Sequence, residues 1–196
     1  MFDTIFRLGL AFCGLVLVQL SIKLLDDYLD QQEDGEHRCS LADVMGQGTV
    51  AYVLLFYAIS SRLDPNWAFT IFISSYACGM LGTSDWLLPS GLSSGVETII
   101  VLLLGLMLAG WSEMLSSWVL VLGVHLIDDV LDEKQQGQHT ATKNLAHRFG
   151  RVEVCLAGIV CSLMALFLNP EKAILSWLAL PLALYIAANP GLGRVR

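Results

Sequence analysis

The chain has 196 residues, of which 55 % are hydrophobic and only 15 % are charged, and its mean hydropathy is +0.63. This composition excludes an ordinary soluble domain and predicts a membrane protein. The net charge of −7 comes largely from acidic clusters, and the lack of a basic patch with interleaved aromatic residues argues against a nucleic-acid partner. Five cysteines lack metal-ligand spacing, which favours packed thiols.

Apolar segments follow one another along the chain. The first, from about Leu8 to Leu25, is long enough to cross a bilayer of roughly 30 Å, and it leads straight into the acidic sequence Asp26-Asp27-Tyr28-Leu29-Asp30. We expect the polar stretch Gln31–Gln47 outside the hydrocarbon, a turn at Ser112–Ser117 and a second polar loop at Glu133–Arg151. Six more apolar segments are expected at Gly46–Ser61, Asn66–Leu81, Ser94–Trp111, Trp118–Leu131, Val152–Leu168 and Ala173–Ala188. The sequence therefore predicts an all-α bundle of about seven transmembrane helices in a single domain, 1–196.

The acidic sequence occurs twice. Residues 125–132 (HLIDDVLD) repeat residues 23–30 (KLLDDYLD), so 102 residues separate Asp26 from Asp128. The same offset pairs Gly35 with Gly137, His37 with His139, Ser40 with Thr142 and Gly48 with Gly150. We therefore predict an internal repeat, with copies at about 1–94 and 95–196.

Seven alternating helices would place both acidic helix ends on one face of the membrane, because the first and fifth helices run in the same direction. Most of the cations fall on that face: Lys23, Arg38, Lys134, Lys143, Arg148, Arg151, Arg194 and Arg196, against Arg7, Arg62 and Lys172 on the other. By the positive-inside rule, we expect the acidic motifs on the cytoplasmic side.

The spacing of the aspartates suggests a chemistry. Residues four apart share a helix face, so Asp26 and Asp30 point one way, and Asp128 and Asp132 can point back at them from a second helix. Four facing carboxylates repel one another unless a cation lies between them. Magnesium takes oxygen ligands and commonly bridges carboxylates to phosphates. The pattern thus predicts a magnesium site that holds a phosphorylated ligand.

These motifs resemble those of a known family. Asp26-Asp27-x-x-Asp30-x-x-x-Asp34 closely resembles the first signature, Asn-Asp-x-x-Asp-x-x-x-Asp, of the UbiA-type intramembrane prenyltransferases, and Asp128-x-x-x-Asp132 resembles the second. The residues Gly137, Thr140 and Gly150 are similar to the loop that follows the second signature. Two features depart from the family: its members usually have about nine helices, and the loop after the first motif offers only His37-Arg38 where an arginine-rich, proline-containing stretch is common.

The resemblance implies a helical bundle around a lipid-open cavity, in which two magnesium ions bind an isoprenyl diphosphate. The allylic cation left by loss of diphosphate would be captured by an aromatic or other lipophilic acceptor. Carried over by position, the core metal ligands and catalytic residues are Asp26, Asp30, Asp128 and Asp132, and the supporting metal ligands are Asp27, Asp34 and Asp129. The cations assigned to the diphosphate are Arg38, Lys134, Lys143 and Arg148, and further candidates are His37, His139 and Tyr28.

Other functions stay open. The pattern Asp-Asp-x-x-Asp is also typical of soluble all-α prenyl diphosphate synthases and terpene synthases, but near-continuous apolar segments argue against a soluble fold. A membrane terpene cyclase would use the same site without an acceptor pocket. A divalent-cation transporter would bind an ion with repeated acids, although the neighbouring Lys and Arg residues favour phosphate. A non-catalytic subunit would need a partner to close its bundle, and a homo- or hetero-oligomer stays open.

Overall fold

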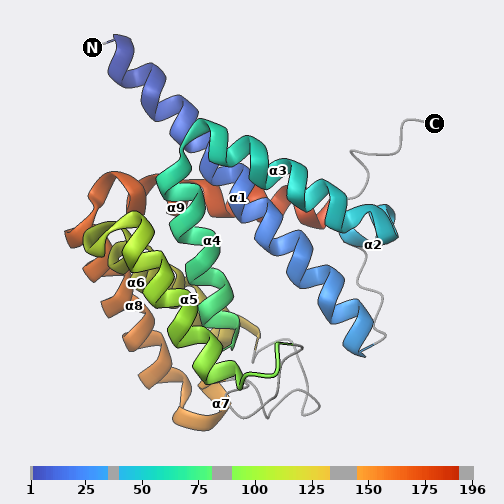
Figure 1. Cartoon of the computed structure of the whole chain (residues 1–196). Helices are drawn as coiled ribbons and strands as arrows, with labels where there is room; N and C mark the ends of the chain where they lie inside the picture. Colours follow the sequence, from blue (N-terminus) through green and yellow to red (C-terminus); the bar gives the residue numbers. More distant parts are fainter. Residues whose placement is uncertain (1, 35–39, 81–89, 133–144, 190–196) are drawn as a thin grey trace. The chain divides into compact units, whose positions relative to one another are not determined.

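The computed structural model describes residues 2–34, 40–80, 90–132 and 145–189, and within these ranges the chain is helical with no strand (Figure 1). The predicted all-α class is therefore confirmed. The chain divides into two compact units: unit 1 is Met1–Phe72 with Ile174–Arg196, and unit 2 is Ile73–Ala173. The elements, in chain order, are α1 (Phe2–Asp34), α2 (Leu41–Met45), the 3-10 helix η1 (Gly46–Gly48), α3 (Thr49–Leu63), α4 (Pro65–Met80), α5 (Ser94–Ala109), α6 (Trp111–Asp132), α7 (Leu145–Phe149), α8 (Arg151–Leu168) and α9 (Pro170–Ala188).

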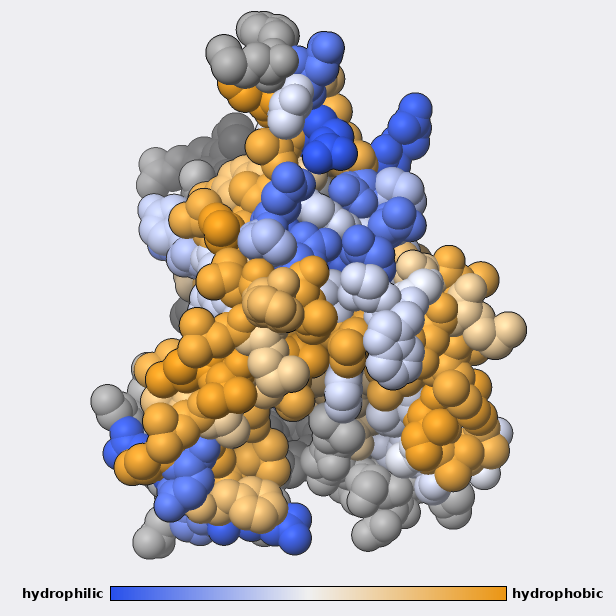
Figure 2. All heavy atoms as spheres, turned by 90° about the vertical axis from the view of Figure 1, so that its left-hand side faces the viewer, coloured by the Kyte–Doolittle hydropathy of each residue, from blue (hydrophilic) through white to orange (hydrophobic). Residues whose placement is uncertain are grey.

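Five stretches of the described chain are long and apolar enough to cross a membrane: Asp3–Gln31, Leu41–Leu63, Trp111–Leu131, Arg151–Leu168 and Pro170–Ala188. The helix α5 is also apolar but shorter, at 16 residues. Apolar side chains form much of the surface seen in Figure 2. The most exposed large apolar side chains include Met107 on α5 and Phe167 on α8, which are 82 % and 89 % exposed. Such a surface is compatible with a multi-pass integral membrane protein whose helices face lipid. The count of seven spans stays a prediction.

Several predicted boundaries were wrong. The helix α1 continues through Asp34, so the first polar stretch begins as helix. Residues Ser112–Ser117, expected as a turn, are the first turns of α6, because Ser116 and Ser117 hydrogen-bond inside the protein instead of facing solvent. The chain instead reverses at Gly110, whose φ of 84° suits glycine and strains other residues. The two expected polar loops also contain the five-residue helices α2 and α7.

In unit 1, α1 packs along α3 at a point where a small residue allows close approach. A Cβ added at Gly14 would lie 3.4 Å from the Cβ of Leu63, and the Ser60 hydroxyl donates to the Gly14 carbonyl at 2.7 Å. Two helical turns further along α1, the Ser21 hydroxyl lies 2.8 Å from the Leu17 carbonyl oxygen and 3.4 Å from that of Val53. Small and hydroxyl-bearing residues of this kind join helices in lipid, where burial of apolar surface gives little drive for association.

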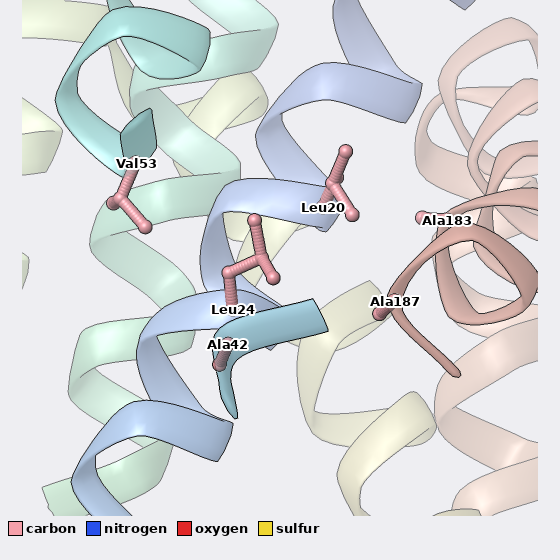
Figure 3. Packing of buried hydrophobic residues seen from close by; sticks show 6 residues of the cluster. All are labelled: Leu20, Leu24, Ala42, Val53, Ala183 and Ala187. Carbon is pink, nitrogen blue, oxygen red and sulfur yellow. The ribbon is translucent and has the colours of Figure 1, made fainter. Parts of the chain in front are cut away.

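The core of unit 1 lies just before the first acidic motif, where α1, α2, α3 and α9 meet (Figure 3). Its buried members are Leu20, Leu24, Ala42, Val53, Ala183 and Ala187. The helix α9 is also joined to α1 by a polar contact, since the Gln19 amide donates to the Ser176 carbonyl at 3.1 Å. The C-terminal part of α1, and with it the motif, is therefore held from three sides.

In unit 2, two glycines bring α6 and α8 together. A Cβ added at Gly158 would lie 2.9 Å from Cγ1 of Ile127 and 3.3 Å from the Gly123 carbonyl oxygen. A Cβ at Gly123 would lie 3.2 Å from the Gly158 carbonyl oxygen in turn. Each glycine thus leaves room for the backbone of the other helix.

The two units share part of their order of elements. In unit 1 a long helix with an acidic end, α1, is followed by the five-residue helix α2, the 3-10 helix η1 and then α3; in unit 2 the long helix α6 is followed by the five-residue helix α7 and then by α8. The next helix starts in the same way in both places. Asp64 precedes Pro65 and accepts the backbone N–H of Trp67, and Asn169 precedes Pro170 and accepts the backbone N–H of Lys172. An N-cap oxygen followed by proline is a strong local start signal for a helix.

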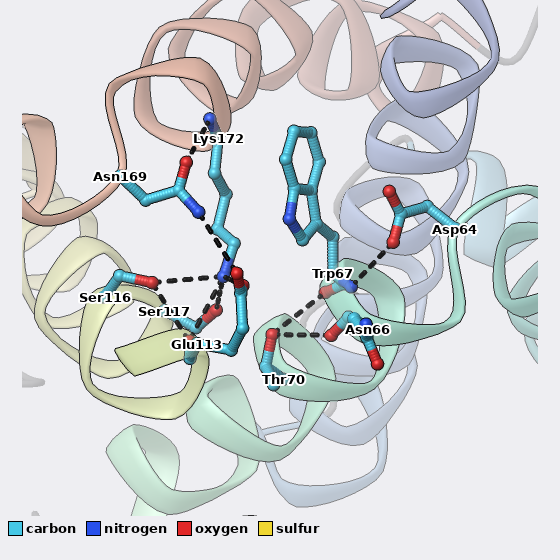
Figure 4. A network of polar contacts seen from close by, with 9 residues as sticks. All are labelled: Asp64, Asn66, Trp67, Thr70, Glu113, Ser116, Ser117, Asn169 and Lys172. Atoms are coloured by element: carbon cyan, nitrogen blue, oxygen red, sulfur yellow. Dashed lines mark hydrogen bonds and ion pairs between the residues drawn. The ribbon is translucent and has the colours of Figure 1, made fainter. Parts of the chain in front are cut away.

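A buried ion pair lies in unit 2 at the start of α6, at the opposite end of that helix from its acidic motif (Figure 4). The side chain of Lys172 is 1 % exposed, and its ammonium donates to the Glu113 carboxylate and to the hydroxyls of Ser116 and Ser117, both at 3.1 Å. The ammonium also donates to the Glu113 backbone carbonyl at 3.1 Å. The side-chain amide of Asn169 donates to the second carboxylate oxygen of Glu113 at 3.4 Å. The network therefore compensates the ammonium fully and ties the start of α9 to α6.

We expect Gly158→Ala to lower the free energy of unfolding by about 1–3 kcal/mol, because the new methyl group overlaps Ile127 and the facing backbone. The matched control is Gly9→Ala in α1, where nothing lies within 4 Å of the added Cβ. That change should leave stability equal or slightly higher, since alanine is the better helix former. Thermal unfolding of both variants in detergent measures the difference, and equal midpoints would contradict the close packing of α6 and α8.

We expect Lys172→Met to destabilise the protein by about 3 kcal/mol, because it leaves the Glu113 carboxylate without its ammonium. The figure is at the low end for a broken buried pair, since the Glu113 side chain is 33 % exposed. The double variant Lys172→Met/Glu113→Leu removes both charges and should recover most of the loss. A double variant no more stable than the single one, in the same unfolding measurement, would show that the ion pair is not the reason.

Candidate functional site

The first acidic motif occupies the C-terminal part of α1. The side chain of Asp26 is 60 % exposed, whereas that of Asp27 is only 10 % exposed. Lys23, one turn earlier, places its Nζ 2.9 Å from Oδ1 of Asp27 and 3.4 Å from Oδ2 of Asp26. These spacings of three and four residues bring the groups together on a helix surface. The motif therefore presents one exposed carboxylate beside an ion pair that is largely shielded.

Lys23 is the functional candidate that the sequence analysis missed. The sequence placed it only among the cations that indicate the cytoplasmic face. A lysine three and four residues before the first two aspartates is, however, a recognisable helix ion-pair pattern. The second motif has His125 at the equivalent position.

The second acidic motif ends α6 in unit 2. The side chain of Asp128 is exposed, and that of Asp129 is half-buried. Leu145 is the first residue of α7, and its backbone N–H donates a hydrogen bond to Oδ2 of Asp129 at 3.1 Å. Leu126, one turn before Asp129 on α6, packs with Ala146 and Val154 in a small core. Asp129 therefore anchors the start of α7 to α6.

The two motifs divide their aspartates in the same way. The first aspartate of each, Asp26 and Asp128, is exposed at the end of its helix. The second of each, Asp27 and Asp129, is engaged inside its own unit, by an ammonium in one case and by a backbone N–H in the other. The first pair thus has the more exposed carboxylates, and Asp27 and Asp129 help to hold local structure.

The structure describes three of the other predicted site residues: Tyr28, Arg148 and Asp30. Tyr28 packs against the core of unit 1, which gives it a structural reason to be aromatic. Arg148 is exposed on α7, with its Cζ 5.2 Å from the centroid of the Phe149 ring. Asp30 is half-buried on α1. The remaining candidates lie outside the described residues, either whole or by their side chains: Asp34, His37, Arg38, Asp132, Lys134, His139 and Lys143.

Glu97 is a further acid near the motif end of unit 2. The sequence places it near the start of an apolar helix, where an acid suits the helix N-terminus, and it does lie in the first turn of α5. Its carboxylate accepts hydrogen bonds from the Tyr76 hydroxyl on one oxygen and from the Ser90 hydroxyl, at 2.7 Å, on the other. These bonds tie the end of α4 to the start of α5, so Glu97 has a structural role.

The donor chemistry of the motifs fits magnesium. Asp26 and Asp128 present carboxylate oxygens, which suit a hard cation, and neither motif contains a thiol that would favour zinc. Over the ranges that the structure describes, no three acidic, histidine or cysteine side chains are gathered closely enough to form a metal cage. Magnesium does not require one, because it commonly binds through one or two carboxylates, keeps several waters and completes its shell with substrate phosphates.

Comparisons with known proteins found no matching family model, no similar curated protein and no similar solved structure.

We expect Asp129→Ala to loosen the start of α7, because it removes the acceptor of the Leu145 N–H and costs about 1–2 kcal/mol of local stability. Asp129→Asn keeps an acceptor oxygen and should retain most of the contact. Hydrogen–deuterium exchange over residues 145–149 in detergent measures the effect, with Asp128→Asn as the matched control. Equal loss of protection in the Ala and Asn variants would argue against this anchoring role.

Proposed function

We propose that the chain is a magnesium-dependent intramembrane prenyltransferase that ionises an isoprenyl diphosphate and transfers the prenyl group to an aromatic or other lipophilic acceptor. The observation that carries the proposal is the pair of acidic helix ends. Each of α1 and α6 is long and apolar enough to cross a membrane, and each finishes in Asp-Asp-x-x-Asp or Asp-x-x-x-Asp with its first aspartate exposed. The resemblance of both motifs to the UbiA-type signatures supports the same reading.

The proposed site combines two features that isoprenyl diphosphates require. Their diphosphate head carries several negative charges and needs metal ions and cations, which the aspartates and the basic loops supply. Their hydrocarbon tail needs an apolar environment, which membrane-length helices supply. Acids placed at helix ends, next to polar connections, suit a ligand with both parts, whereas ion transport favours acids within the span.

The reaction would proceed by breaking the bond between the allylic carbon and the diphosphate oxygen. The electron pair leaves with the diphosphate, the allylic cation is attacked by an electron-rich carbon of the acceptor, and that carbon then loses a proton. Magnesium, when bound, offsets the charge that develops on the leaving diphosphate. The chain's own part is to present the carboxylates of Asp26 and Asp128, to orient the head group through basic residues, and to exclude water from the cation by apolar helix faces. By the distribution of positive charge, the head group is expected on the cytoplasmic side.

We expect Asp26→Ala and Asp128→Ala each to reduce magnesium-dependent diphosphate release by about 100-fold or more, because each removes a carboxylate that holds the metal against the leaving group. Asp3→Ala, at the other end of α1, is the matched control and should leave release unchanged. The measurement uses the purified full chain in detergent with geranyl, farnesyl and geranylgeranyl diphosphates, with and without magnesium. Asp30→Ala and Asp132→Ala test the same reading at the second position of each motif.

The products decide between the proposed reaction and its rivals. Release that requires an added lipid extract, with a prenylated product in the mass spectrum, supports transfer. Release without an acceptor, giving a cyclic hydrocarbon or alcohol, would instead indicate a terpene cyclase. No release with any substrate, alongside measurable metal binding, would reject the enzyme and favour transport or a non-catalytic role.

A further inference from the structure

Lys23 is an unusual residue for its place in the chain. It lies within the first membrane-length stretch, Asp3–Gln31, and its side chain is only 32 % exposed. A charged side chain in such a stretch is costly unless it is paired, so lysines there usually have an identifiable partner. The partners of Lys23 are the first two aspartates of the acidic motif itself, at 3.4 Å and 2.9 Å.

The two contacts of Lys23 differ in character. The contact with Asp27 is short and the Asp27 side chain is only 10 % exposed, so this pair is a shielded ion pair. The contact with Asp26 is longer, and the Asp26 side chain is 60 % exposed, so this second pair lies where solvent and ligands reach it. An ammonium has three donor hydrogens and can serve both carboxylates at once. Loss of the longer contact with Asp26 to another cation would therefore leave the shorter contact with Asp27 in place.

The second motif has a different residue at this position. His125 stands at the position of Lys23, and the second aspartate of that motif, Asp129, is held by the backbone N–H of Leu145. Both motifs thus hold their second aspartate inside the protein, and in the first motif the holding group is a full positive charge that also contacts the exposed aspartate. That second contact joins Lys23 to the carboxylate proposed as the metal ligand.

We propose that Lys23 is an internal counter-cation that competes with the metal ion for Asp26 and then contacts the diphosphate. Without metal, its ammonium balances Asp26 and Asp27 together. When a metal ion binds Asp26, the ammonium keeps Asp27 and directs its freed N–H groups toward the phosphate oxygens beside that metal. This inference rests on the proposed function, since it takes the first motif to be a site for metal and diphosphate. Lys23 is thereby a positioning residue in the free protein and a diphosphate-binding residue in the complex.

The test measures metal binding in the absence of substrate, with Mn²⁺ as a probe that electron paramagnetic resonance detects. We expect Lys23→Met to bind Mn²⁺ about three- to tenfold more tightly than the unchanged protein, because a competing charge has been removed. Lys23→Arg keeps the charge and should bind Mn²⁺ with nearly unchanged affinity. His125→Met, at the equivalent position of the second motif, is the matched control and should change little. A purely structural role of Lys23 would give weaker or unchanged Mn²⁺ binding in Lys23→Met, and either result would overturn the inference.

A double-mutant cycle identifies the carboxylate involved. If Lys23 competes at Asp26, then Lys23→Met should raise Mn²⁺ affinity in the unchanged protein but not in the Asp26→Asn background. An equal gain in both backgrounds would overturn the assignment to Asp26. Lys23→Gln, which keeps a polar head for Asp27, takes the place of Lys23→Met if the latter does not purify as a single species.

The second half of the test adds inorganic pyrophosphate at saturating Mn²⁺. We expect its affinity to fall about tenfold in Lys23→Met and to be retained in Lys23→Arg, since a charge-assisted contact has been lost in the first case only. Unchanged pyrophosphate affinity in Lys23→Met would overturn the diphosphate contact. Absence of Mn²⁺ binding by the unchanged protein and by every variant would reject the proposed metal site, and the inference with it. Mn²⁺ binding by the unchanged protein with no gain in Lys23→Met would reject the inference alone.

Discussion

A carboxylate at the end of an apolar helix has to be balanced by a positive group, a hydrogen-bond donor or water, and this requirement shapes both units. Unit 1 balances Asp27 with the ammonium of Lys23, and unit 2 balances Asp129 with the Leu145 backbone N–H. At the start of α6, Glu113 is balanced by the buried Lys172. An unbalanced carboxylate in such surroundings would cost several kcal/mol, roughly the size of a small domain's whole stability. Each acid of this kind therefore brings a partner with it, and the partner determines which elements meet.

The balanced acids depend in turn on rigid helix pairs. In lipid, helices associate mainly by close contact, and small residues at the interface allow it. Gly14 performs this role between α1 and α3, and Gly158 performs it between α6 and α8. Because both pairs are fixed within their own units, the aspartates at the ends of α1 and α6 keep defined neighbours instead of fraying as free helix ends do. The helices that carry the acidic motifs are thus each held by a close helix–helix contact.

The sequence predicted the helical class and most helix positions because long apolar runs have few alternatives. It failed where polar residues are used inside the protein. The sequence of Ser116 and Ser117 favours a turn, yet both hydroxyls accept hydrogen bonds from the buried ammonium of Lys172. Lys172 itself was expected as a charge on the face of the membrane opposite the motifs, and it is buried in an ion pair with Glu113. The carboxylates of the candidate site could be found from their duplication. The distinction between exposed and engaged aspartates could not, because Asp26 and Asp27 are identical in chemistry and differ only in the contacts that packing gives them.

That distinction bears on the function of the acidic motifs. If every aspartate were a metal ligand, each motif would concentrate two adjacent negative charges on one ion, and the metal-free protein would have to tolerate their repulsion. The contacts of Asp27 and Asp129 inside the units lower that repulsion, and Asp26 and Asp128 are exposed at the helix ends. Few protein ligands per ion leave coordination positions open for water and phosphate oxygens. Under the proposed function, motifs of this kind would suit a metal that arrives with, and leaves with, a diphosphate.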